Sequence, residues 1–222
     1  MSIAIALDGP AGAGKSSIAK RAAKALGYIY VDTGALYRTI GLAAMRAGVE
    51  PQPSAEVDSL LSRITVSLEF NEQGEQVVLL DGEDVSSLIR TPEASMMASK
   101  ISAVPSVRAY LLDLQRDMAK THNVIMDGRD IGTVVLPDAK VKIFLTASPE
   151  ARAERRYKEL VEKGTDTTFE EVLRDVKERD YNDSHRAIAP LKPAEDSILV
   201  DTTELDFEQS VEAIINVIKE NR

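Results

Sequence analysis

The 222-residue sequence predicts an α/β fold built on a parallel β-sheet, with an antiparallel element inserted into it. Three observations support this prediction. Short apolar runs alternate with helical patterns over residues 1–48, which is typical of a parallel sheet covered by helices. A glycine-rich segment joins the first apolar run to the first helix. Within a predicted insertion over residues 63–103, residues 64–70 alternate between apolar and polar positions and are followed by a turn and a second strand, which predicts a β-hairpin.

In the first half of the chain, glycines mark where the predicted helices end. Gly27 and Gly48 each follow a helical pattern, and glycine is the residue that most often terminates a helix. The inserted hairpin is either a decorative excursion or a flap that covers a substrate. In order, we predict a strand over residues 3–7, a helix over 15–26, a strand over 28–31, a helix over 35–47, a linker around 51–53, and hairpin strands over 64–70 and 76–80.

The second half returns to alternating helices and strands, and two of its helices are strongly charged. We find no internal repeat and no low-complexity tract. In order, we predict a helix over residues 105–120, strands over 124–126 and 141–145, charged helices over 149–163 and 169–181, a last strand over 198–200, and a closing helix over 207–219.

Composition excludes several classes of site. The chain has no cysteine, which rules out disulfides, a cysteine nucleophile and thiolate zinc sites, and its two histidines are too few for a multi-histidine metal site. The net charge of −9 argues against binding to nucleic acid or to an anionic membrane. No apolar run is long enough to span a bilayer. We expect a monomer in the cytoplasm.

The segment Gly9–Ser16 matches the pattern Gly-x-x-x-x-Gly-Lys-Ser and stands between a predicted strand and a predicted helix. Its glycines let successive backbone N–H groups point at phosphate oxygens, and the helix adds the positive end of its dipole. Lys15 supplies a cation for the outer phosphates, and the Ser16 hydroxyl suits Mg²⁺. The sequence therefore predicts a phosphate site made of Gly9, Pro10, Ala11, Gly12, Ala13, Gly14, Lys15, Ser16 and Ser17.

Polar residues also follow two other predicted strands, at the edge where open parallel sheets bind ligands. One group runs from Asp32 to Arg38, and the other is Asp127-Gly128-Arg129-Asp130. Asp127 follows an apolar strand and could join Ser16 at the metal ion. The alternative is that Asp127 and Asp130 only cap helices or shape turns.

Arginines gather in the charged helices. Arg152, Arg155 and Arg156 fall on one helical face, because they are three and four residues apart, and Arg179 and Arg186 follow near the end of the next helix. The helical face is either solvated and paired with glutamates, or part of a lid that closes over a transferring phosphoryl group. Such a transfer requires positioning and charge rather than a nucleophile. The sequence has no Ser-His-Asp or Cys-His arrangement, which fits that chemistry.

Four segments in this order, residues 8–16, 32–38, 127–133 and 177–180, resemble the bacterial cytidylate kinases. The likeness runs nearly end to end and includes the predicted hairpin. It implies a three-layer P-loop kinase fold, with a five-stranded parallel core sheet flanked by helices, an insertion that binds the nucleoside monophosphate, and a short helical lid. The single domain, residues 1–222, would comprise a core (about 1–62, 104–148 and 187–222), the insertion (about 63–103) and a lid region (about 149–186).

The resemblance also implies an activity, the Mg²⁺-dependent transfer of the γ-phosphoryl group of ATP to CMP or dCMP. The products would be ADP and CDP or dCDP. It implies that Thr33, Tyr37 and Arg38 line the CMP site, with Arg38 on the phosphate. It implies that Ser99, Arg108 and Asp130 read the cytosine edge and that Arg129 holds the acceptor phosphate. By the same resemblance, Arg179 and Asp183 would reach the ribose, and Arg186 would reach the phosphates. The implied catalytic residues are Lys15, Arg129, Arg152, Arg155, Arg156 and Arg186.

Cytosine makes chemical sense for this set of side chains. Its exocyclic amine can donate to Asp130 and Ser99, while Arg108 can donate to the N3 and O2 acceptors. Uracil has a carbonyl in place of the amine, so Asp130 would face an acceptor with an acceptor. A mispaired buried polar group costs about 1–3 kcal/mol, so we expect CMP to be preferred over UMP.

Other phosphate-binding classes remain as alternatives. The nearest alternative is an adenylate-kinase-like or shikimate-kinase-like enzyme, although the predicted hairpin favours a cytidylate kinase. A guanine-nucleotide switch would need an Asn-Lys-x-Asp base reader, and an ABC-type ATPase would need a Leu-Ser-Gly-Gly-type signature. Neither tetrapeptide occurs in the sequence.

Overall fold

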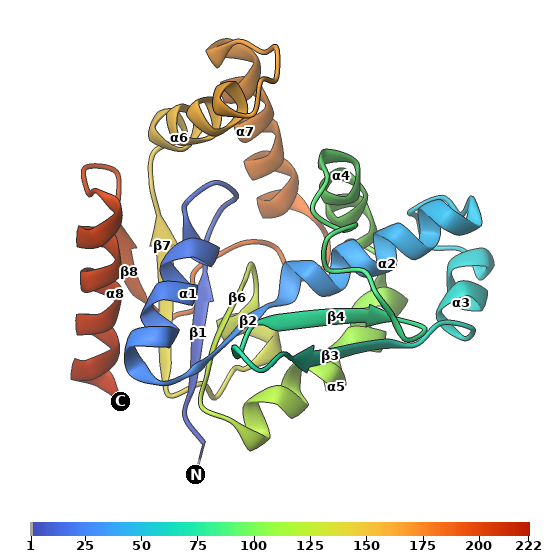
Figure 1. The fold of residues 1–222 in the computed structure, drawn as a ribbon, viewed down its shortest axis with the longest axis horizontal. Helices are drawn as coiled ribbons and strands as arrows, with labels where there is room; N and C mark the ends of the chain where they lie inside the picture. The colour runs from blue at the N-terminus through green and yellow to red at the C-terminus, as the bar shows by residue number, and fades with distance from the viewer. Residues whose placement is uncertain (1) are drawn as a thin grey trace.

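The computed structural model describes residues 2–222, and within them the strands form two sheets (Figure 1). The larger sheet is parallel and has five strands in the order β2-β6-β1-β7-β8, which confirms the predicted core. The smaller sheet is antiparallel and has the order β3-β4-β5. The strands are β1 (Ala4–Asp8), β2 (Ile29–Asp32), β3 (Val66–Phe70), β4 (Gln76–Leu80), β5 (Glu83–Asp84), β6 (Val124–Gly128), β7 (Val141–Thr146) and β8 (Ile198–Asp201).

Helices cover both faces of the parallel sheet, because its strands are apolar on both sides. On one face, Ile5, Leu7 and Ile143 pack against α1 and α8, which lie side by side in Figure 1. On the other face, Ala6 and Met126 pack toward α5. The helices are α1 (Lys15–Leu26), α2 (Thr33–Ala47), α3 (Ala55–Leu61), α4 (Pro92–Ile101), α5 (Pro105–Thr121), α6 (Pro149–Glu162), α7 (Phe169–His185) and α8 (Phe207–Asn221).

Three helical segments of the structure are not predicted from the sequence. The short helices α3 and α4 begin where the side chains of Ser54 and Thr91 accept hydrogen bonds from backbone N–H groups, and Pro92 adds a rigid first turn to α4. The third is a single π-helical turn, η1 (Ile131–Val135), after β6. Such turns depend on tertiary contacts rather than on a sequence pattern, and they are frequent at functional sites.

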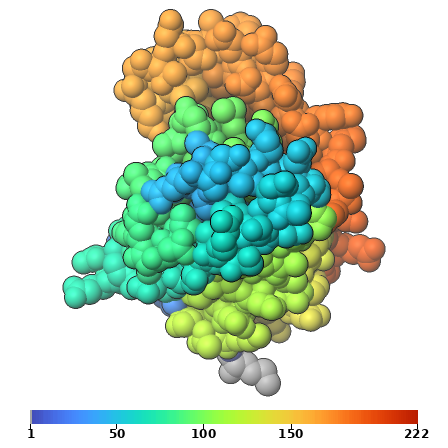
Figure 2. Space-filling model, turned by 90° about the vertical axis from the view of Figure 1, so that its right-hand side faces the viewer, coloured from blue at the N-terminus to red at the C-terminus, as the bar shows by residue number. Residues whose placement is uncertain are grey.

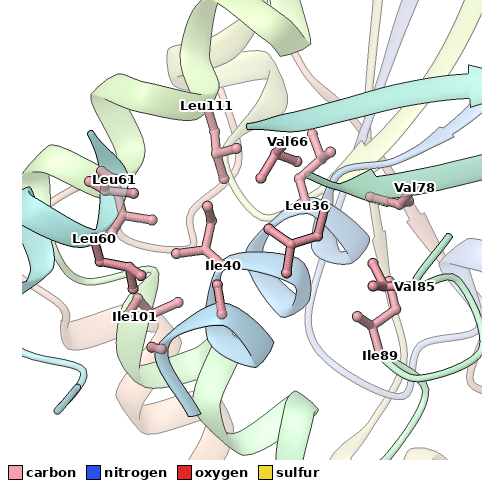
Figure 3. Close-up of a cluster of buried hydrophobic side chains, with 14 of the residues drawn as sticks. Leu36, Ile40, Leu60, Leu61, Val66, Val78, Val85, Ile89, Ile101 and Leu111 are labelled. Atoms are coloured by element: carbon pink, nitrogen blue, oxygen red, sulfur yellow. The ribbon is translucent and has the colours of Figure 1, made fainter. Parts of the chain in front are cut away.

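The small sheet shares a hydrophobic core with the helices beneath it (Figure 3). Leu36 and Ile40 of α2 and Leu60 of α3 are fully or nearly buried there, together with Val66 and Val78 of the hairpin. A segment with this much shared apolar surface is part of the folded domain, because separating it would expose the whole cluster to water. The hairpin is therefore not a loosely attached flap.

The helices α6 and α7 rise from the rest of the molecule and form a knob in Figure 2. They are held together by a small core of their own, made of Ala153, Val172 and Val176 with partly buried neighbours. A capping box at Thr168 and Glu171 starts α7. No helix among residues 2–222 is long and apolar enough to cross a membrane.

Candidate active site

The Gly9–Ser16 segment forms a tight loop between β1 and α1, as predicted. A Cβ atom on Gly9 would lie 1.9 Å from the carbonyl oxygen of Leu145, so only glycine lets the loop pass this close to β7. Gly14 caps α1 with φ 83°, a left-handed conformation that glycine adopts without strain. These two positions explain the conformation of the loop.

Lys15 is buried at the foot of this loop, and its ammonium group donates to the carbonyl oxygen of Pro10 at 2.8 Å. Burial, together with the positive charge of Arg129, lowers the pKa of Lys15 to about 7, against the opposing charges of Asp127 and Asp8. An anion next to Lys15 would restore its charge. The Lys15 ammonium would therefore be stabilised by an anionic group such as phosphate in the loop.

Asp127 is the second-last residue of β6 and lies beside Lys15 and Ser16. The hydroxyl of Tyr30 donates to its Oδ2 at 2.9 Å. Burial raises the pKa of Asp127, and the nearby charge of Asp32 raises it too, whereas Lys15 and the Ser16 hydroxyl lower it. A carboxylate and a hydroxyl are hard oxygen ligands, so Ser16 and Asp127 fit a magnesium ion that takes its other ligands from phosphate and water. Within residues 2–222, no three acidic, histidine or cysteine side chains converge as a metal cluster.

A second cluster of polar side chains, apart from the one at Lys15 and Asp127, surrounds Asp130, which is 4% exposed. Arg108 of α5 forms an ion pair with Asp130 and also donates to the carbonyl oxygen of Ser102 at 3.1 Å. Arg186 donates to the other carboxylate oxygen of Asp130 at 3.4 Å. The guanidinium of Arg108 also lies 5.6 Å from the centre of the Tyr37 ring, a cation–π contact. Residues from four parts of the chain thus meet around one carboxylate.

The position of Asp130 depends on Asp8, the last residue of β1. The Asp8 carboxylate accepts hydrogen bonds from the backbone N–H groups of Ile131 (2.8 Å) and Gly132 (2.7 Å), at the start of η1. Burial raises the pKa of Asp8 to about 6, although these two hydrogen bonds act in the opposite direction. Asp8 therefore ties the turn that carries Asp130 to the strand that carries the phosphate loop.

The wall between these two groups consists of further charged pairs. Arg38 donates to Asp32 at 2.7 Å, and Arg129 donates to Asp183 at 2.9 Å. Burial lowers the pKa of Arg179, and the charge of Arg129 adds to this effect. The Nε atoms of Arg38 and Arg179 are buried without a hydrogen-bond partner. Unpaired buried donors beside a cavity suit an anionic ligand.

One cavity of about 350 Å³ connects the phosphate loop to the cluster at Asp130. All ten predicted substrate-binding residues line it, and so do six of the nine predicted loop residues. The predicted residues on its wall are Ala11, Gly12, Gly14, Lys15, Ser16, Ser17, Thr33, Tyr37, Arg38, Ser99, Arg108, Asp127, Arg129, Asp130, Arg155, Arg179, Asp183 and Arg186.

Five predicted residues do not line this cavity. Gly9, Pro10 and Ala13 are buried and shape the loop from behind. Arg152 is 2% exposed and does not line the cavity; its guanidinium pairs with Asp180 and donates to the carbonyl oxygens of Ala147 and Ala11. The side chain of Arg156 is 42% exposed and pairs with Glu159. The structure thus separates the three predicted lid arginines, of which only Arg155 is on the cavity wall.

Comparison with known proteins gives the family. The sequence matches the cytidylate kinase family over residues 5–220. The chain belongs to this family. The cytidylate kinase of Thermosipho melanesiensis is 50% identical over 216 residues, which cover 97% of this chain and 96% of the relative. The cytidylate kinase of Caldanaerobacter subterraneus subsp. tengcongensis is 49% identical over 221 residues, which cover 100% and 96%.

More distant likeness is limited to the fold. A solved structure of an uncharacterized protein from Eubacterium ventriosum covers 98% of this chain and 99% of its own chain with a TM-score of 0.54, at 13% identity. The near-full-length sequence matches, and not this structural likeness, show that the chain belongs to the cytidylate kinase family.

Sequence reasoning missed three residues that shape the site of this family member. Asp8 stands next to the glycine motif, and Asp32 opens the segment that ends at Arg38, so both were visible as polar ends of apolar strands. The sequence does not show what either carboxylate does, because Asp8 contacts a turn more than a hundred residues away and the contact of Asp32 with Arg38 depends on how α2 is oriented. Ser102 gives no signal, since it acts partly through its backbone carbonyl.

Proposed function

We propose that this chain transfers the γ-phosphoryl group of ATP to CMP or dCMP, giving ADP and CDP or dCDP. The observation that carries the proposal is the single cavity that joins the phosphate loop to a charged pocket of different chemistry. Two nucleotides that exchange a phosphoryl group must lie end to end in one site. Its relatives are named cytidylate kinases, which supports the same reaction.

In this proposal, the Gly9–Ser17 segment binds the phosphates of ATP. The backbone N–H groups and the start of α1 would hold the β- and γ-phosphates, and the ammonium group of Lys15 would neutralise negative charge on the phosphoryl group that is transferred. The lowered pKa of Lys15 supports this role, because a phosphate would supply the negative charge that the buried ammonium lacks.

The acceptor would lie on the other side of the cavity. Arg38 and Arg129 would hold its phosphate, Arg179 and Asp183 would reach its ribose, and Arg186 would reach the phosphates. Thr33 and Tyr37 would complete the wall of the CMP site. This arrangement is supported by the unpaired buried Nε atoms of Arg38 and Arg179, which are free to donate to a ligand.

Asp130, Arg108 and Ser99 would read the cytosine ring. Asp130 is buried and fixed from behind by η1, so its carboxylate can select for an amine donor. Arg108 would donate to N3 and O2 while its guanidinium stays beside Tyr37. The cost of a mispaired buried group, about 1–3 kcal/mol, corresponds to roughly one to two decades of preference for CMP over UMP.

A divalent cation, Mg²⁺ in this proposal, would be held by Ser16, with Asp127 as a further ligand. When bound, it neutralises charge on the phosphates. The protein's own part is to orient the two nucleotides and to exclude water, which requires the lid region to approach the cavity. Arg155 already lines the cavity, and Arg152 and Arg156 complete the proposed catalytic set together with Lys15, Arg129 and Arg186.

We further propose that the chain acts as a monomer in the cytoplasm, on these small molecules and not on nucleic acid or membranes. The absence of cysteine suits a reducing compartment, and the net charge of −9 disfavours polyanions.

The test is a coupled assay of ADP release with ATP and a panel of CMP, dCMP, UMP, AMP and shikimate. We expect rapid turnover with CMP and dCMP, slower turnover with UMP, and none with shikimate. Equal kcat/KM for UMP and CMP would contradict the proposed role of Asp130. Turnover with shikimate or AMP in place of CMP would contradict the acceptor.

A further inference from the structure

Gln76, at the start of β4, links the antiparallel sheet to the edge of the parallel sheet by two hydrogen bonds. Its Oε1 accepts from the backbone N–H of Asp32 at 2.8 Å, and its Nε2 donates to the backbone carbonyl of Asp32 at 3.1 Å. Because β2 is an edge strand, these two groups of Asp32 have no neighbouring strand on that side. The carboxamide of Gln76 takes the place of a strand's peptide group.

Asp32 in turn orients the start of α2. Its Oδ1 accepts from the backbone N–H of Ala35 at 3.0 Å and so caps the helix, while its Oδ2 accepts from Arg38 at 2.7 Å. Every polar group of Asp32 is thereby engaged either by Gln76 or by α2. The Arg38 side chain lines the cavity, and its Nε is buried without a partner.

The hairpin itself does not reach the cavity. The residues of the insertion that line it are Ser95, Ala98, Ser99 and Ser102, and none comes from residues 63–90. A neighbouring contact, Glu75 with Lys20 of α1 at 2.7 Å, is more than half exposed on both sides and contributes little. The paired hydrogen bonds of Gln76 are therefore a direct polar link from the hairpin to the acceptor side, alongside the apolar packing of the hairpin against α2.

We propose that Gln76 is a positioning residue for the acceptor phosphate. It fixes the backbone of Asp32, whose carboxylate then holds the guanidinium of Arg38 toward the cavity. The proposal rests on the proposed function, since it takes the ligand of Arg38 to be the phosphate of a nucleoside monophosphate. In this proposal the hairpin does not cover the substrate. It supports the binding site from outside the cavity, by holding Asp32 and through it Arg38 in place.

The test compares CMP with cytidine, which lacks only the phosphate. For the wild type, Gln76→Ala, Gln76→Glu and the control Glu75→Ala, we would measure dissociation constants for CMP and cytidine, and KM for ATP. We expect Gln76→Ala to weaken CMP binding by about tenfold, the size of one lost pair of hydrogen bonds, while cytidine binding and KM for ATP change less than about twofold. Gln76→Glu should be at least as damaging, because its carboxylate would face the carbonyl of Asp32. Glu75→Ala should match the wild type.

A double-mutant cycle separates positioning from a general loss of stability. In an Arg38→Ala background, adding Gln76→Ala should not weaken CMP binding further, because the group that Gln76 orients is gone. Equal losses for CMP and cytidine, or additive losses in the double mutant, would overturn the proposal. If the wild type turns over CMP but Gln76→Ala binds it normally, only the positioning role fails. If the wild type does not phosphorylate CMP, both the function and this role fail.

Discussion

The two halves of the cavity are built in opposite ways. The phosphate loop is eight consecutive residues, Gly9–Ser16, and its shape follows from glycine conformation and the start of a helix. The acceptor half brings together side chains from α2, α4, α5, the turn after β6 and α7. A contiguous site tolerates changes elsewhere in the fold, whereas a dispersed site depends on every element that carries one of its parts.

The largest expected effect is at the contiguous half. Lys15→Ala should lower kcat by roughly 10³-fold, the scale seen when one preorganised charge or donor is removed from a transition state. CMP binding should change little, because Lys15 belongs to the donor side. Steady-state kinetics and CMP titration check this, with the exposed Lys24→Ala on the same helix as the control. A loss confined to CMP affinity would mean that the two halves are not separate.

The next largest effects are expected at the predicted lid arginines, and the structure predicts that replacing Arg156 and replacing Arg152 affect Tm differently. Arg156→Ala should lower kcat by about 10²-fold with an unchanged Tm, because its side chain is half exposed and available to move. Arg152→Ala should lower kcat as well, but should also lower Tm by several degrees, because it leaves Asp180 without a partner and frees the loop carbonyl of Ala11. Thermal unfolding and kinetics on both variants check the difference. Equal losses of kcat at unchanged Tm would place both residues in one catalytic face.

Asp130→Ala tests the dispersed half. We expect the kcat/KM ratio of CMP to UMP to fall by about 10- to 30-fold, since the carboxylate that discriminates amine from carbonyl is removed. The exposed Asp138→Ala, on the same connection, serves as the control. The ratio should be measured with both nucleotides competing in one reaction. A ratio equal to that of the wild type would remove Asp130 from base recognition.

The smallest effect concerns stability. Lys15 has a pKa lowered to about 7 in the folded protein, against an unfolded value near 10.5, so the folded state binds fewer protons between these values. Unfolding free energy therefore rises with pH across this window, and the buried ammonium costs most at and below pH 7. Lys15→Met should raise Tm by about 2–4 °C at pH 7 without nucleotide, with a gain that shrinks toward pH 10. A gain independent of pH would show that the charge is not its cause.

Local patterns in the sequence predicted the individual strands of the core and the glycine loop, from apolar runs of strand length and glycines at fixed spacing, while the resemblance implied that five of the strands form one parallel sheet. The sequence did not predict α3, α4 or η1. The first two are short helices marked mainly by their caps, Ser54 and Thr91. The turn η1 is stabilised by Asp8, a residue more than a hundred positions away, and no local pattern reports such a contact.

The candidate site divides in the same way. The sequence by itself determined the glycine loop at the start of α1, which we propose holds phosphate, and the resemblance of its motifs pointed to residues that the fold brings to one cavity. Only the tertiary structure decided which of the three lid arginines reaches that cavity, because equal spacing on a helix does not say what each side chain meets. The burial of Arg152 against Asp180 and the attachment of Gln76 to Asp32 are contacts across 28 and 44 residues. Their energy comes from excluding water between distant segments, which composition and periodicity do not encode.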